Sequence, residues 1–264
     1  MPIRVVIQGA LGRMGQEAVN AACKDPHLQP VGAVDAKADE KSLLLPDRAG
    51  SIPLSSNLEA ILTQTQPQVL VDFSVAEATM NAVRLATKRK ISLVIGTTGL
   101  SADALGEIDR LARANDVGAI VAPNFALGAV VMAHLAKIAA KYFDYAEIIE
   151  LHHEQKLDAP SGTALSTARA IAEARGKPFL YSKTQKETLS GTRGGEFQGI
   201  AVHSVRMPGL MAHQEVIFGI SGQTLTIRHD TINRECYMPG VVLAIKKVVE
   251  LKGLTYGLDA LLGL

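Results

Sequence analysis

The sequence predicts an α/β fold with two parts: an N-terminal, doubly wound parallel sheet, and a central α+β domain whose sheet is mixed or antiparallel. Short apolar strands alternate with amphipathic helices through the first half of the chain, which is typical of a parallel sheet covered by helices on both faces. From about residue 200 onward, alternating strands are joined by a tight turn, which favours antiparallel pairing. The 264 residues allow one or two domains with a sizeable core.

The composition argues against nucleic-acid and membrane partners. The chain has 27 Lys and Arg against 26 Asp and Glu, so no global basic field attracts nucleic acid. Aromatic residues make up 4% of the chain and Trp is absent, which leaves few platforms for stacking bases. No apolar run reaches membrane-spanning length, and no leader-like segment precedes the first strand. Cys23 and Cys236 form no CxxC arrangement, so we expect a soluble cytoplasmic protein.

The first strand–helix–strand unit carries a glycine-rich turn. Its predicted strand, helix and strand cover residues 4–7, 14–24 and 28–34. Gly9, Gly12 and Gly15 have GxxGxxG spacing, and Asp35 ends the second strand. In the Rossmann-like dinucleotide-binding arrangement, such glycines let the backbone approach a pyrophosphate and such an acid binds the ribose hydroxyls; the alternative is a glycine-rich turn in another α/β protein. The candidate cofactor-binding residues here are Gly9, Ala10, Leu11, Gly12, Arg13, Met14 and Asp35.

Charges near this turn bear on the choice between NADH and NADPH. Asp35 favours NAD because a carboxylate repels the additional phosphate of NADP. Arg13 and Lys37 could offset that repulsion by binding the phosphate, although a lone Lys is usually a solvated surface charge. We therefore expect both NADH and NADPH to be usable, and Lys37 joins the cofactor-binding candidates.

The rest of the first domain continues the alternation of strands and helices. A loop is predicted over residues 38–56 because Pro46, Gly50 and Pro53 interrupt it. Ser101 is a suitable N-cap for the helix that continues through Leu111. The other predicted strands cover residues 68–73, 92–95 and 118–121, and the other helices cover 58–62, 77–88 and 127–142.

Two of these strands end in loops that are candidates for the nicotinamide side of a cofactor site. In doubly wound sheets, ligands bind beyond the carboxyl ends of the strands. Ordinary turn chemistry is the alternative, because turns use the same residue types. The candidate residues are Gly96, Thr97, Thr98, Ala122, Pro123, Asn124 and Phe125.

The central domain is predicted to combine a helix with alternating strands. The helix covers residues 163–175 and ends at Gly176, and Ser221-Gly222 closes a hairpin. The glycine-rich segment 183–199 is predicted to be a long loop. A last helix begins at Pro239 and is closed by Gly253. The predicted strands cover residues 146–151, 200–207, 213–220 and 223–231.

A charged loop connects the first strand of the central domain with its helix. The backbone N–H groups at a helix start point outward without partners, so this helix start could hold an anion. Lys156 could help to hold a small acid there, and a histidine could transfer a proton near neutral pH. The alternative is a surface histidine pair followed by an ordinary capped helix. The candidates in this loop are His152, His153, Lys156, Ser161, Gly162 and Thr163.

Other functions find less support in the sequence. A metal site that combines the histidine pair with His203 or His213 would lack the HxxxH spacing or Cys/His cluster typical of such sites. A semialdehyde dehydrogenase needs a thiolate nucleophile, but Cys23 falls on the first helix and Cys236 lies far from any strand-end loop. A nucleotide-sensing regulator without catalysis would need the glycine turn but not the charged loop, and would tend to carry a basic DNA-binding element, which is not visible.

Together these motifs resemble those of the dihydrodipicolinate reductase family of bacterial and plant lysine biosynthesis, nearly from end to end. The similar stretches are residues 9–15, 71–74, 96–99, 123–125 and 150–164. The last stretch is similar to a family signature that few other proteins combine with the first. Some members carry an Arg directly after the acid of the second strand, where this chain has Ala36 and then Lys37. That departure argues against a strict preference for NADP.

The resemblance implies a nucleotide domain over residues 1–123 and 238–264, and a domain over 124–237 that binds substrate and builds a homotetramer. It implies hydride transfer from NAD(P)H to ring carbon C4 of a cyclic imine dicarboxylate, which gives tetrahydrodipicolinate. It assigns His152 as proton donor and acceptor and Lys156 as a second proton donor. The implied substrate-binding positions are His153, Gly162 and Thr163, and the implied nucleotide-binding positions are 9–14, 35, 96–98 and 122–125. A plastid location would replace the cytoplasm in a plant protein.

Overall fold

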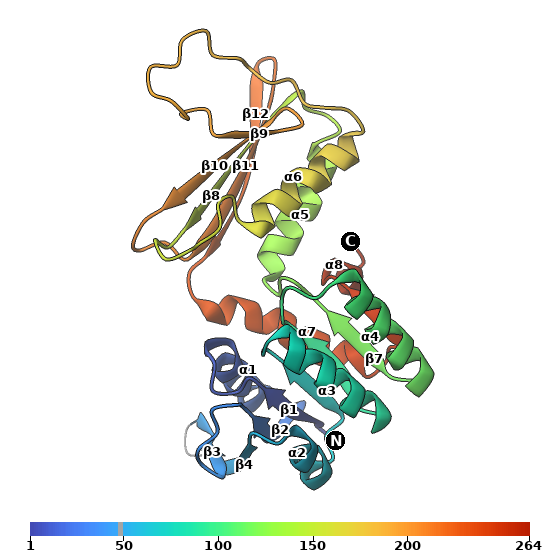
Figure 1. The fold of residues 1–264 in the computed structure, drawn as a ribbon. Coiled ribbons are helices and arrows are strands. Elements are labelled where there is room, and N and C mark those ends of the chain that lie inside the picture. Colours follow the sequence, from blue (N-terminus) through green and yellow to red (C-terminus); the bar gives the residue numbers. More distant parts are fainter. Residues whose placement is uncertain (47–49) are drawn as a thin grey trace. The chain divides into compact units, whose positions relative to one another are not determined.

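The computed structural model describes residues 1–46 and 50–264. The chain folds into two compact units, one formed by Met1–Leu127 with Arg234–Leu264 and the other by Gly128–Asn233 (Figure 1). The first unit therefore contains both ends of the chain, and the second is one continuous stretch. In the part of the chain that is described, no helix is both long and apolar enough to cross a membrane.

The first unit is built on a large sheet, which has eight strands within the described residues, in the order β13-β7-β6-β5-β1-β2-β4-β3. The strands are β1 (Ile3–Gln8), β2 (Leu28–Val34), β3 (Ser42–Leu44), β4 (Ser51–Ser55), β5 (Val69–Asp72), β6 (Ser92–Ile95), β7 (Gly118–Val121) and β13 (Gly253–Tyr256). Neighbours from β13 through to β4 run parallel, and β3 runs antiparallel to β4. The predicted, mostly parallel sheet is confirmed.

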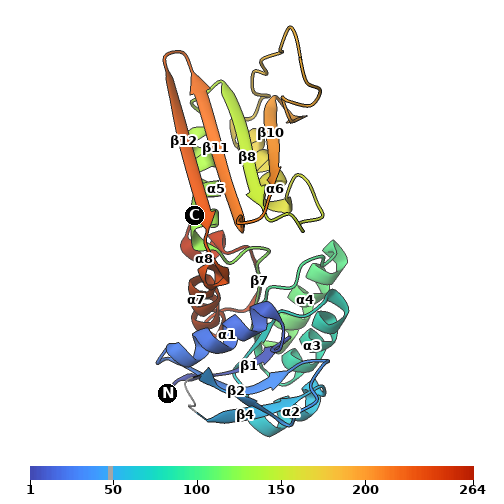
Figure 2. The ribbon, with the colours of Figure 1, turned by 90° about the vertical axis from the view of Figure 1, so that its left-hand side faces the viewer.

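Helices cover both faces of this sheet (Figure 2). On one face lie α1 (Arg13–Lys24) and α7 (Met238–Val248), and on the other lie α2 (Leu58–Thr65), α3 (Ala76–Lys88) and α4 (Ala102–Asn115). The second face forms one apolar core with the sheet, in which Leu70, Leu93 and Ile108 are fully buried. A short 3₁₀-helix (Arg234–Tyr237) precedes α7, and α8 (Asp259–Leu262) follows β13. The predicted double winding is thus confirmed.

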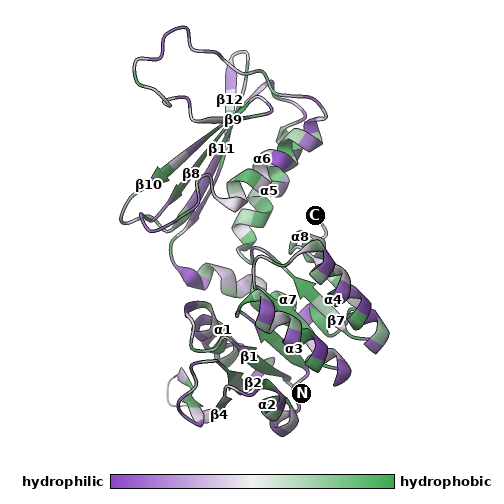
Figure 3. Cartoon of the chain, in the orientation of Figure 1, coloured by the Kyte–Doolittle hydropathy of each residue, from purple (hydrophilic) through white to green (hydrophobic). Residues whose placement is uncertain are grey.

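Local sequence explains where several of these elements form. Each of the four residues of β5, β6 and β7 is buried, as expected for central strands of a parallel sheet. Figure 3 shows β7 in the green of hydrophobic residues. Asn57 Oδ1 accepts the Ala60 N–H at 3.0 Å, and Ser101 Oγ accepts the Ala104 N–H at 3.2 Å. These side chains cap α2 and α4, which confirms the predicted N-cap at Ser101.

The predicted loop over residues 38–56 is wrong in part, because it contains β3 and β4. β4 forms because Ile52 and Leu54 are buried while their neighbours in the strand are not, and Leu54 pairs with Ala33 of β2. This alternation outweighs the turn signal of Pro53. Residues 47–49 of the predicted loop lie outside the described residues.

The last helix is shorter than predicted. α7 ends at Val248, and Gly253 does not close it. Gly253 instead begins β13 with a φ of +78° and pairs with Gly118 of β7. β5, β6 and β7 also have four residues, but all of theirs are buried, whereas only the first residue of β13 is. The sequence of β13 therefore lacks the apolar run that predicted the other three strands.

The second unit, all of whose residues are described, contains a five-stranded mixed sheet in the order β12-β11-β8-β10-β9. The strands are β8 (Tyr145–His152), β9 (Gly195–Phe197), β10 (Ile200–Arg206), β11 (Ala212–Ile220) and β12 (Gln223–Thr231). β10 runs parallel to β8, and the other neighbours run antiparallel. The helices α5 (Leu127–Ala139) and α6 (Gly162–Arg175) cover one face of the sheet (Figure 2). The fully buried Ile148, Ile171 and Phe218 belong to the shared core.

Most predictions for the second unit are confirmed. β11 and β12 pair antiparallel across Ser221-Gly222, where Gly222 has a φ of +79°. α6 ends at Gly176, which has a φ of +74°. Two predictions need correction. The predicted loop over 183–199 contains β9, which pairs with the start of β10, and α5 ends at Ala139 rather than at residue 142.

Candidate active site

The predicted cofactor-binding residues lie where β1, β2, β6 and β7 end. Residues 9–14 connect β1 to α1 and enter its first turn, and residues 35 and 37 follow β2. Residues 96–98 follow β6, and residues 122–125 follow β7. These strands are parallel, so their carboxyl ends meet at one edge of the sheet. That edge is where doubly wound sheets bind ligands.

The turn after β1 requires glycine at two positions. Gly9 has a φ of +76°, and a Cβ atom on it would lie 2.5 Å from the Phe73 carbonyl oxygen. A Cβ atom on Gly15 would lie 2.0 Å from the Gly9 carbonyl oxygen. Both distances are shorter than real contacts, so any other residue would push the backbone apart. The two glycines therefore keep the turn tight against the start of α1, with its backbone open to a ligand.

Asp35 is anchored beside this turn by two backbone N–H groups. The Leu11 N–H donates to Asp35 Oδ2 at 2.9 Å, and the Lys37 N–H donates to Oδ1 at 3.0 Å. These bonds fix the carboxylate and leave lone pairs on both oxygens for the hydroxyls of a ribose. The side chains of Lys37 and Arg13 are exposed.

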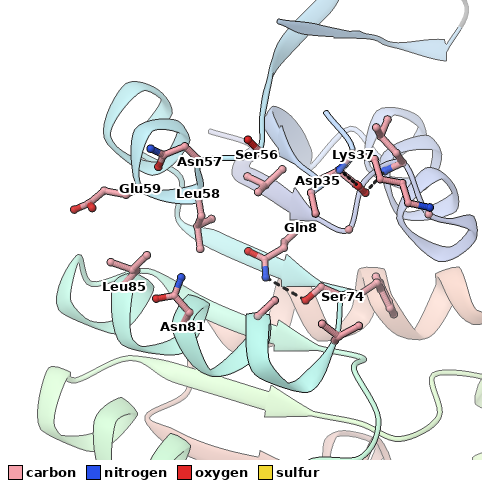
Figure 4. Close-up of a pocket in the computed structure, with 18 residues that line it drawn as sticks. Gln8, Asp35, Lys37, Ser56, Asn57, Leu58, Glu59, Ser74, Asn81 and Leu85 are labelled. Carbon is pink, nitrogen blue, oxygen red and sulfur yellow. Dashed lines mark hydrogen bonds between the residues drawn. The ribbon is translucent and has the colours of Figure 1, made fainter. Parts of the chain in front are cut away.

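A pocket of about 790 Å³ opens beside Asp35 (Figure 4). Pockets of this size hold small molecules and cofactors. The predicted residues that line it are Gly9, Leu11, Gly12, Asp35 and Lys37. The described lining also has polar residues that the sequence analysis missed, namely Gln8, Ser56, Asn57, Glu59, Ser74 and Asn81. It does not include the predicted Ala10, Arg13 and Met14 or the loops after β6 and β7.

Asp72, a buried carboxylate that the sequence analysis did not select as a site residue, ties these strand ends together. It lies at the end of β5 and is 0% exposed. Gln8 Nε2 donates to Oδ1 at 3.2 Å, and the N–H and hydroxyl of Ser74 donate to it at 3.1 and 2.6 Å. The hydroxyls of Thr79 and Thr97 donate to Oδ2, the second at 3.2 Å. The sequence signal was a lone carboxylate in an apolar strand, which needs several partners when buried.

The loops after β6 and β7 pack around two aromatic rings. A Cβ atom on Gly96 would lie 2.1 Å from the Phe73 ring, so only glycine lets that ring approach. The rings of Phe73 and Phe125 meet edge to face, with centroids 6.0 Å apart. Asn124 Oδ1 accepts the Ala126 N–H at 2.9 Å. These contacts hold both loops at the carboxyl edge of the sheet.

The second unit carries the charged loop between β8 and α6. His152 is the last residue of β8, and His153 and Lys156 follow in the loop. Lys156 Nζ donates to Asp158 Oδ1 at 2.6 Å, and this bond lowers the pKa of Asp158 below its usual value. The Asp158 side chain is 57% exposed. Lys156 is therefore paired with a solvent-facing carboxylate, which another carboxylate can replace at little cost.

The start of α6 completes this loop. Ser161 is buried and caps the helix, because its Oγ accepts the Ala164 N–H at 3.1 Å. Gly162 and Thr163 are the first residues of α6, and both are exposed. The first N–H groups of a helix have no partner within it, so this end can receive an anion. The structure thus places the six predicted loop residues on one continuous stretch.

Glu150, which the sequence analysis did not single out, contacts both His152 and Ser161 of this stretch. Its side chain is 0% exposed. Both terminal nitrogens of Arg206 bind its carboxylate, Nη1 to Oε2 at 3.0 Å and Nη2 to Oε1 at 2.7 Å. Oε2 also contacts His152 Nδ1, and Oε1 accepts the Ser161 N–H at 3.2 Å. The sequence signal was a carboxylate on the apolar face of a predicted strand.

Burial and charge together set the protonation of this cluster. Burial raises the pKa of Glu150, but hydrogen bonds from Arg206, Ser204 and His152 bring it below its usual value. Burial lowers the pKa of His152, the Glu150 hydrogen bond partly opposes this, and the charges of Lys156 and Arg206 add to the lowering. Near neutral pH, Glu150 is therefore ionised and His152 is mainly neutral, with its ring proton on Nδ1 toward the carboxylate.

Three of the described histidines contact carboxylates. Besides His152, His203 Nε2 lies 2.9 Å from Glu147 Oε2 and His213 Nδ1 lies 2.7 Å from Asp230 Oδ1. Within residues 1–46 and 50–264, no three His, Cys, Asp or Glu side chains are grouped as ligands for a metal ion. Each of these three histidines thus contacts one carboxylate, and His213 Nε2 also accepts the Met211 N–H at 3.2 Å.

The fold, the glycine turn, the anchored Asp35 and the nearby pocket define a nicotinamide-dependent oxidoreductase that acts on a small molecule. Family models described as the N-terminus and the C-terminus of dihydrodipicolinate reductase match residues 3–125 and 128–262. The chain therefore belongs to the dihydrodipicolinate reductase family, and the resemblance seen in the sequence is confirmed.

Individual relatives agree with this assignment. A 4-hydroxy-tetrahydrodipicolinate reductase of Dehalococcoides mccartyi is 58% identical over 263 residues, which cover 100% of this chain and 99% of that protein. A reductase of the same name from Moorella thermoacetica is 51% identical over 263 residues, 98% of each chain. The solved structure of a dipicolinate-bound dihydrodipicolinate reductase from Paenisporosarcina sp. TG-14 has a TM-score of 0.88 at 44% identity and covers 98% of this chain and 99% of its own.

Proposed function

We propose that this chain reduces 4-hydroxy-tetrahydrodipicolinate with NADH or NADPH and yields tetrahydrodipicolinate, with loss of water from the hydroxylated precursor. The observation that carries the proposal is the loop between β8 and α6. It presents an imidazole at His152, an ammonium group at Lys156 and a free helix start at Gly162 on one stretch. A cyclic dicarboxylate that must be held and protonated needs these three kinds of group.

The loop residues hold the substrate. Lys156 Nζ exchanges Asp158 for one substrate carboxylate and, by its charge, makes the ring a better electrophile. The N–H groups of Gly162 and Thr163 at the start of α6 bind a carboxylate, and His153 adds a contact from the loop. When bound, the nicotinamide supplies a hydride to ring carbon C4. The residues of the loop therefore fix the ring and prepare it for added charge.

His152 completes the reduction as a general acid. Negative charge moves through the conjugated C=C–C=N system toward the ring nitrogen, and the product needs a proton. Nδ1 is engaged with Glu150, so Nε2 is the ring nitrogen that faces the substrate. A bound dianion raises the pKa of His152, because a neighbouring negative charge favours the imidazolium form. Lys156 is a second proton donor in the same loop.

The two parts of the chain take different roles in this proposal. Residues 1–123 and 238–264 bind the dinucleotide, and residues 124–237 bind the substrate and build the assembly. The glycine turn and the pocket beside Asp35 support the first role. The loop between β8 and α6 supports the second.

A homotetramer is part of the proposal, built through the second unit. Val131, Leu135, Ile138 and Tyr142 follow one another three or four residues apart along and just beyond α5, and they are 40%, 45%, 46% and 71% exposed. An exposed apolar stripe of this kind is typical of an interface. Light scattering should give the mass of four chains for the wild type and a smaller species for Leu135→Asp with Ile138→Asp. A wild-type monomer would refute the assembly.

Both cofactors are usable in this proposal. The fixed carboxylate of Asp35 suits the ribose diol of NADH, and Lys37 at the same pocket suits the phosphate of NADPH. Lys37→Ala should therefore lower kcat/KM for NADPH more than for NADH. An equal effect on both cofactors would remove Lys37 from the phosphate site.

The test of the function is cofactor oxidation with the precursor made in place by its synthase from pyruvate and aspartate semialdehyde. NADH and NADPH are supplied separately, and turnover with either is the expected result. Lys156→Ala should weaken substrate binding and lower turnover, and normal steady-state constants would refute its role. Wild-type protein that is folded and binds nucleotide but gives no turnover would favour a regulator without catalysis.

A further inference from the structure

We propose that Glu150 is the positioning residue for the proton donor, and that with Arg206 it fixes His152 and the substrate-binding loop as one unit. The proposal rests on the function given above, which assigns proton transfer to His152. It adds two residues, one on β8 and one on β10, for which that function gives no role.

The geometry of Glu150 leaves little freedom. Its side chain is fully buried, and those of His152 and Arg206 are 14% and 19% exposed. Arg206 grips the carboxylate with two nitrogens, at 2.7 and 3.0 Å, and this fork geometry fixes both oxygens in a plane. Oε2 then contacts His152 Nδ1, which fixes the rotation of the imidazole ring. The ring is thus held from behind, with Nε2 directed away from the carboxylate.

The same pair also braces the loop that holds the substrate. Glu150 Oε1 accepts the N–H of Ser161, the residue that caps α6, at 3.2 Å. Arg206 Nη2 donates to the Asp158 carbonyl oxygen at 2.7 Å. The loop is therefore hydrogen-bonded at two points, once to the Glu150 carboxylate and once to Arg206, which binds that carboxylate. A shift of Glu150 would therefore move His152 relative to the N–H groups of Gly162 and Thr163, which bind a carboxylate of the substrate.

The charges around His152 explain why this carboxylate matters for protonation. Lys156 in the loop and Arg206 on β10 both disfavour the imidazolium form, as does burial. Glu150 is the group that favours it. Ala212, which pairs with His152 from β11, and Gly162 and Thr163, which begin α6, carry no charge. Removing the charge of Glu150 should lower the pKa of His152 further and make the acid form scarcer.

The same strand provides a matched control. Glu147 lies on the opposite face of β8 and also pairs with an arginine and a histidine: Arg193 Nη2 at 2.6 Å and His203 Nε2 at 2.9 Å. Glu147→Gln therefore removes the same charge from the same strand without touching the proposed site. It is expected to leave turnover and its pH profile unchanged.

The decisive variant is Glu150→Gln, compared with Glu147→Gln in the intact chain. A general acid contributes about 10²- to 10⁴-fold to a rate, so we expect kcat to fall about tenfold to a hundredfold in Glu150→Gln. Turnover requires the protonated imidazole, so the alkaline fall in kcat should move to lower pH. NADH affinity should not change. A wild-type pH profile in Glu150→Gln, or an equal loss in Glu147→Gln, would overturn the proposal.

A second measurement separates this proposal from the proposed function. ¹⁵N-labelled histidine NMR follows the titration of His152 without any substrate, and His152→Gln identifies its signal. The pKa of His152 should be lower in Glu150→Gln than in the wild type, whether or not the reductase assay succeeds. An inactive wild type with this shift refutes the function and leaves the coupling intact. An unshifted pKa refutes the coupling even if the wild type is active.

A double-mutant cycle tests whether Glu150 acts through His152. In the His152→Gln background, Glu150→Gln should lower kcat little further, because the group it positions is already gone. Independent, multiplying losses would overturn the proposal. Should Glu150→Gln fail to fold, Glu150→Asp retains the charge on a shorter side chain. It should lower kcat, but the alkaline fall in kcat should occur at nearly the same pH as in the wild type. A fall at lower pH would contradict the role of the charge.

Discussion

Strand β8 carries two clusters of similar composition, each with a glutamate, an arginine and a histidine. Glu150 lies on the face that packs against α6, with Arg206 and His152 around it, and its side chain is 0% exposed. Glu147 lies on the other face, with Arg193 and His203, and its side chain is 36% exposed. Three residues of spacing on a strand place the two side chains on opposite faces of the sheet.

The difference in burial gives the two clusters different consequences. The pKa of each glutamate lies below its usual value, since burial, which raises it, is outweighed by the hydrogen bonds from its arginine and histidine. The buried charge of Glu150 has lost its water, so its partners must all be present. Glu147 keeps access to solvent, so its pairs are screened and replaceable. Composition alone therefore does not tell which cluster is structural support for a site.

The largest contrast should come from removing the carboxylates. Glu150→Leu leaves Arg206 without its partner, so we expect a loss of about 3–5 kcal/mol in the free energy of unfolding. Denaturant titration followed by circular dichroism measures this loss. Replacing Arg206 by Leu as well should recover part of the stability, because no uncompensated charge remains. A loss below that of Glu147→Leu would show that the buried pair is not the stronger one.

The next effect concerns two helix caps, one inside and one outside the loop that Glu150 contacts. Ser161→Ala and Ser101→Ala each remove an N-cap, at α6 and α4, and each should cost about 1 kcal/mol of stability. Only the first lies in the loop that Glu150 braces. In the reductase assay, KM for the precursor should therefore rise in Ser161→Ala and stay unchanged in Ser101→Ala. Equal KM values in the two variants would show that the cap of α6 does not affect substrate binding.

A smaller effect is expected at the exposed cluster. Glu147→Gln should change the free energy of unfolding by about 0–1 kcal/mol, because a partly exposed pair gains little over its solvated state. That change should shrink as salt is added, since exposed charges are screened. Denaturant titrations at low and high salt measure both quantities. A large effect that persists at high salt would place Glu147 in the same class as Glu150.

The smallest contrast lies in the pH dependence of stability. The pKa of His152 in the folded chain is below its usual 6.5, so stability is full above that value and falls as the pH drops below it. The lowered pKa of Glu150 adds a second loss below its usual value of 4.5. His152→Gln should remove the first loss and keep the second. Unfolding measured in steps from neutral to acidic pH would show this, and an unchanged curve would contradict it.

The sequence predicted much of the first unit because its signals are local. Buried four-residue strands, the N-cap at Ser101 and the glycine turn at Gly9 depend on neighbours in the chain, so periodicity and residue type reveal them. The strands β4 and β13 escaped because their stability comes from pairing with β2 and β7. The roles of the candidate site residues stay predictions, which measurements on variants can test.

The sequence by itself determined the alternation of strands and helices, the class of fold, and the order of the charged loop before α6. These features follow from short-range sterics and hydrogen bonding. Only the tertiary structure decided which carboxylates are buried at the strand ends. Glu150 and Arg206 are 56 residues apart, and Asp72 gathers donors from positions as far away as Gln8. The reason is physical: the cost of burying a charge is met by partners that strand register brings together, and register is a property of the folded sheet.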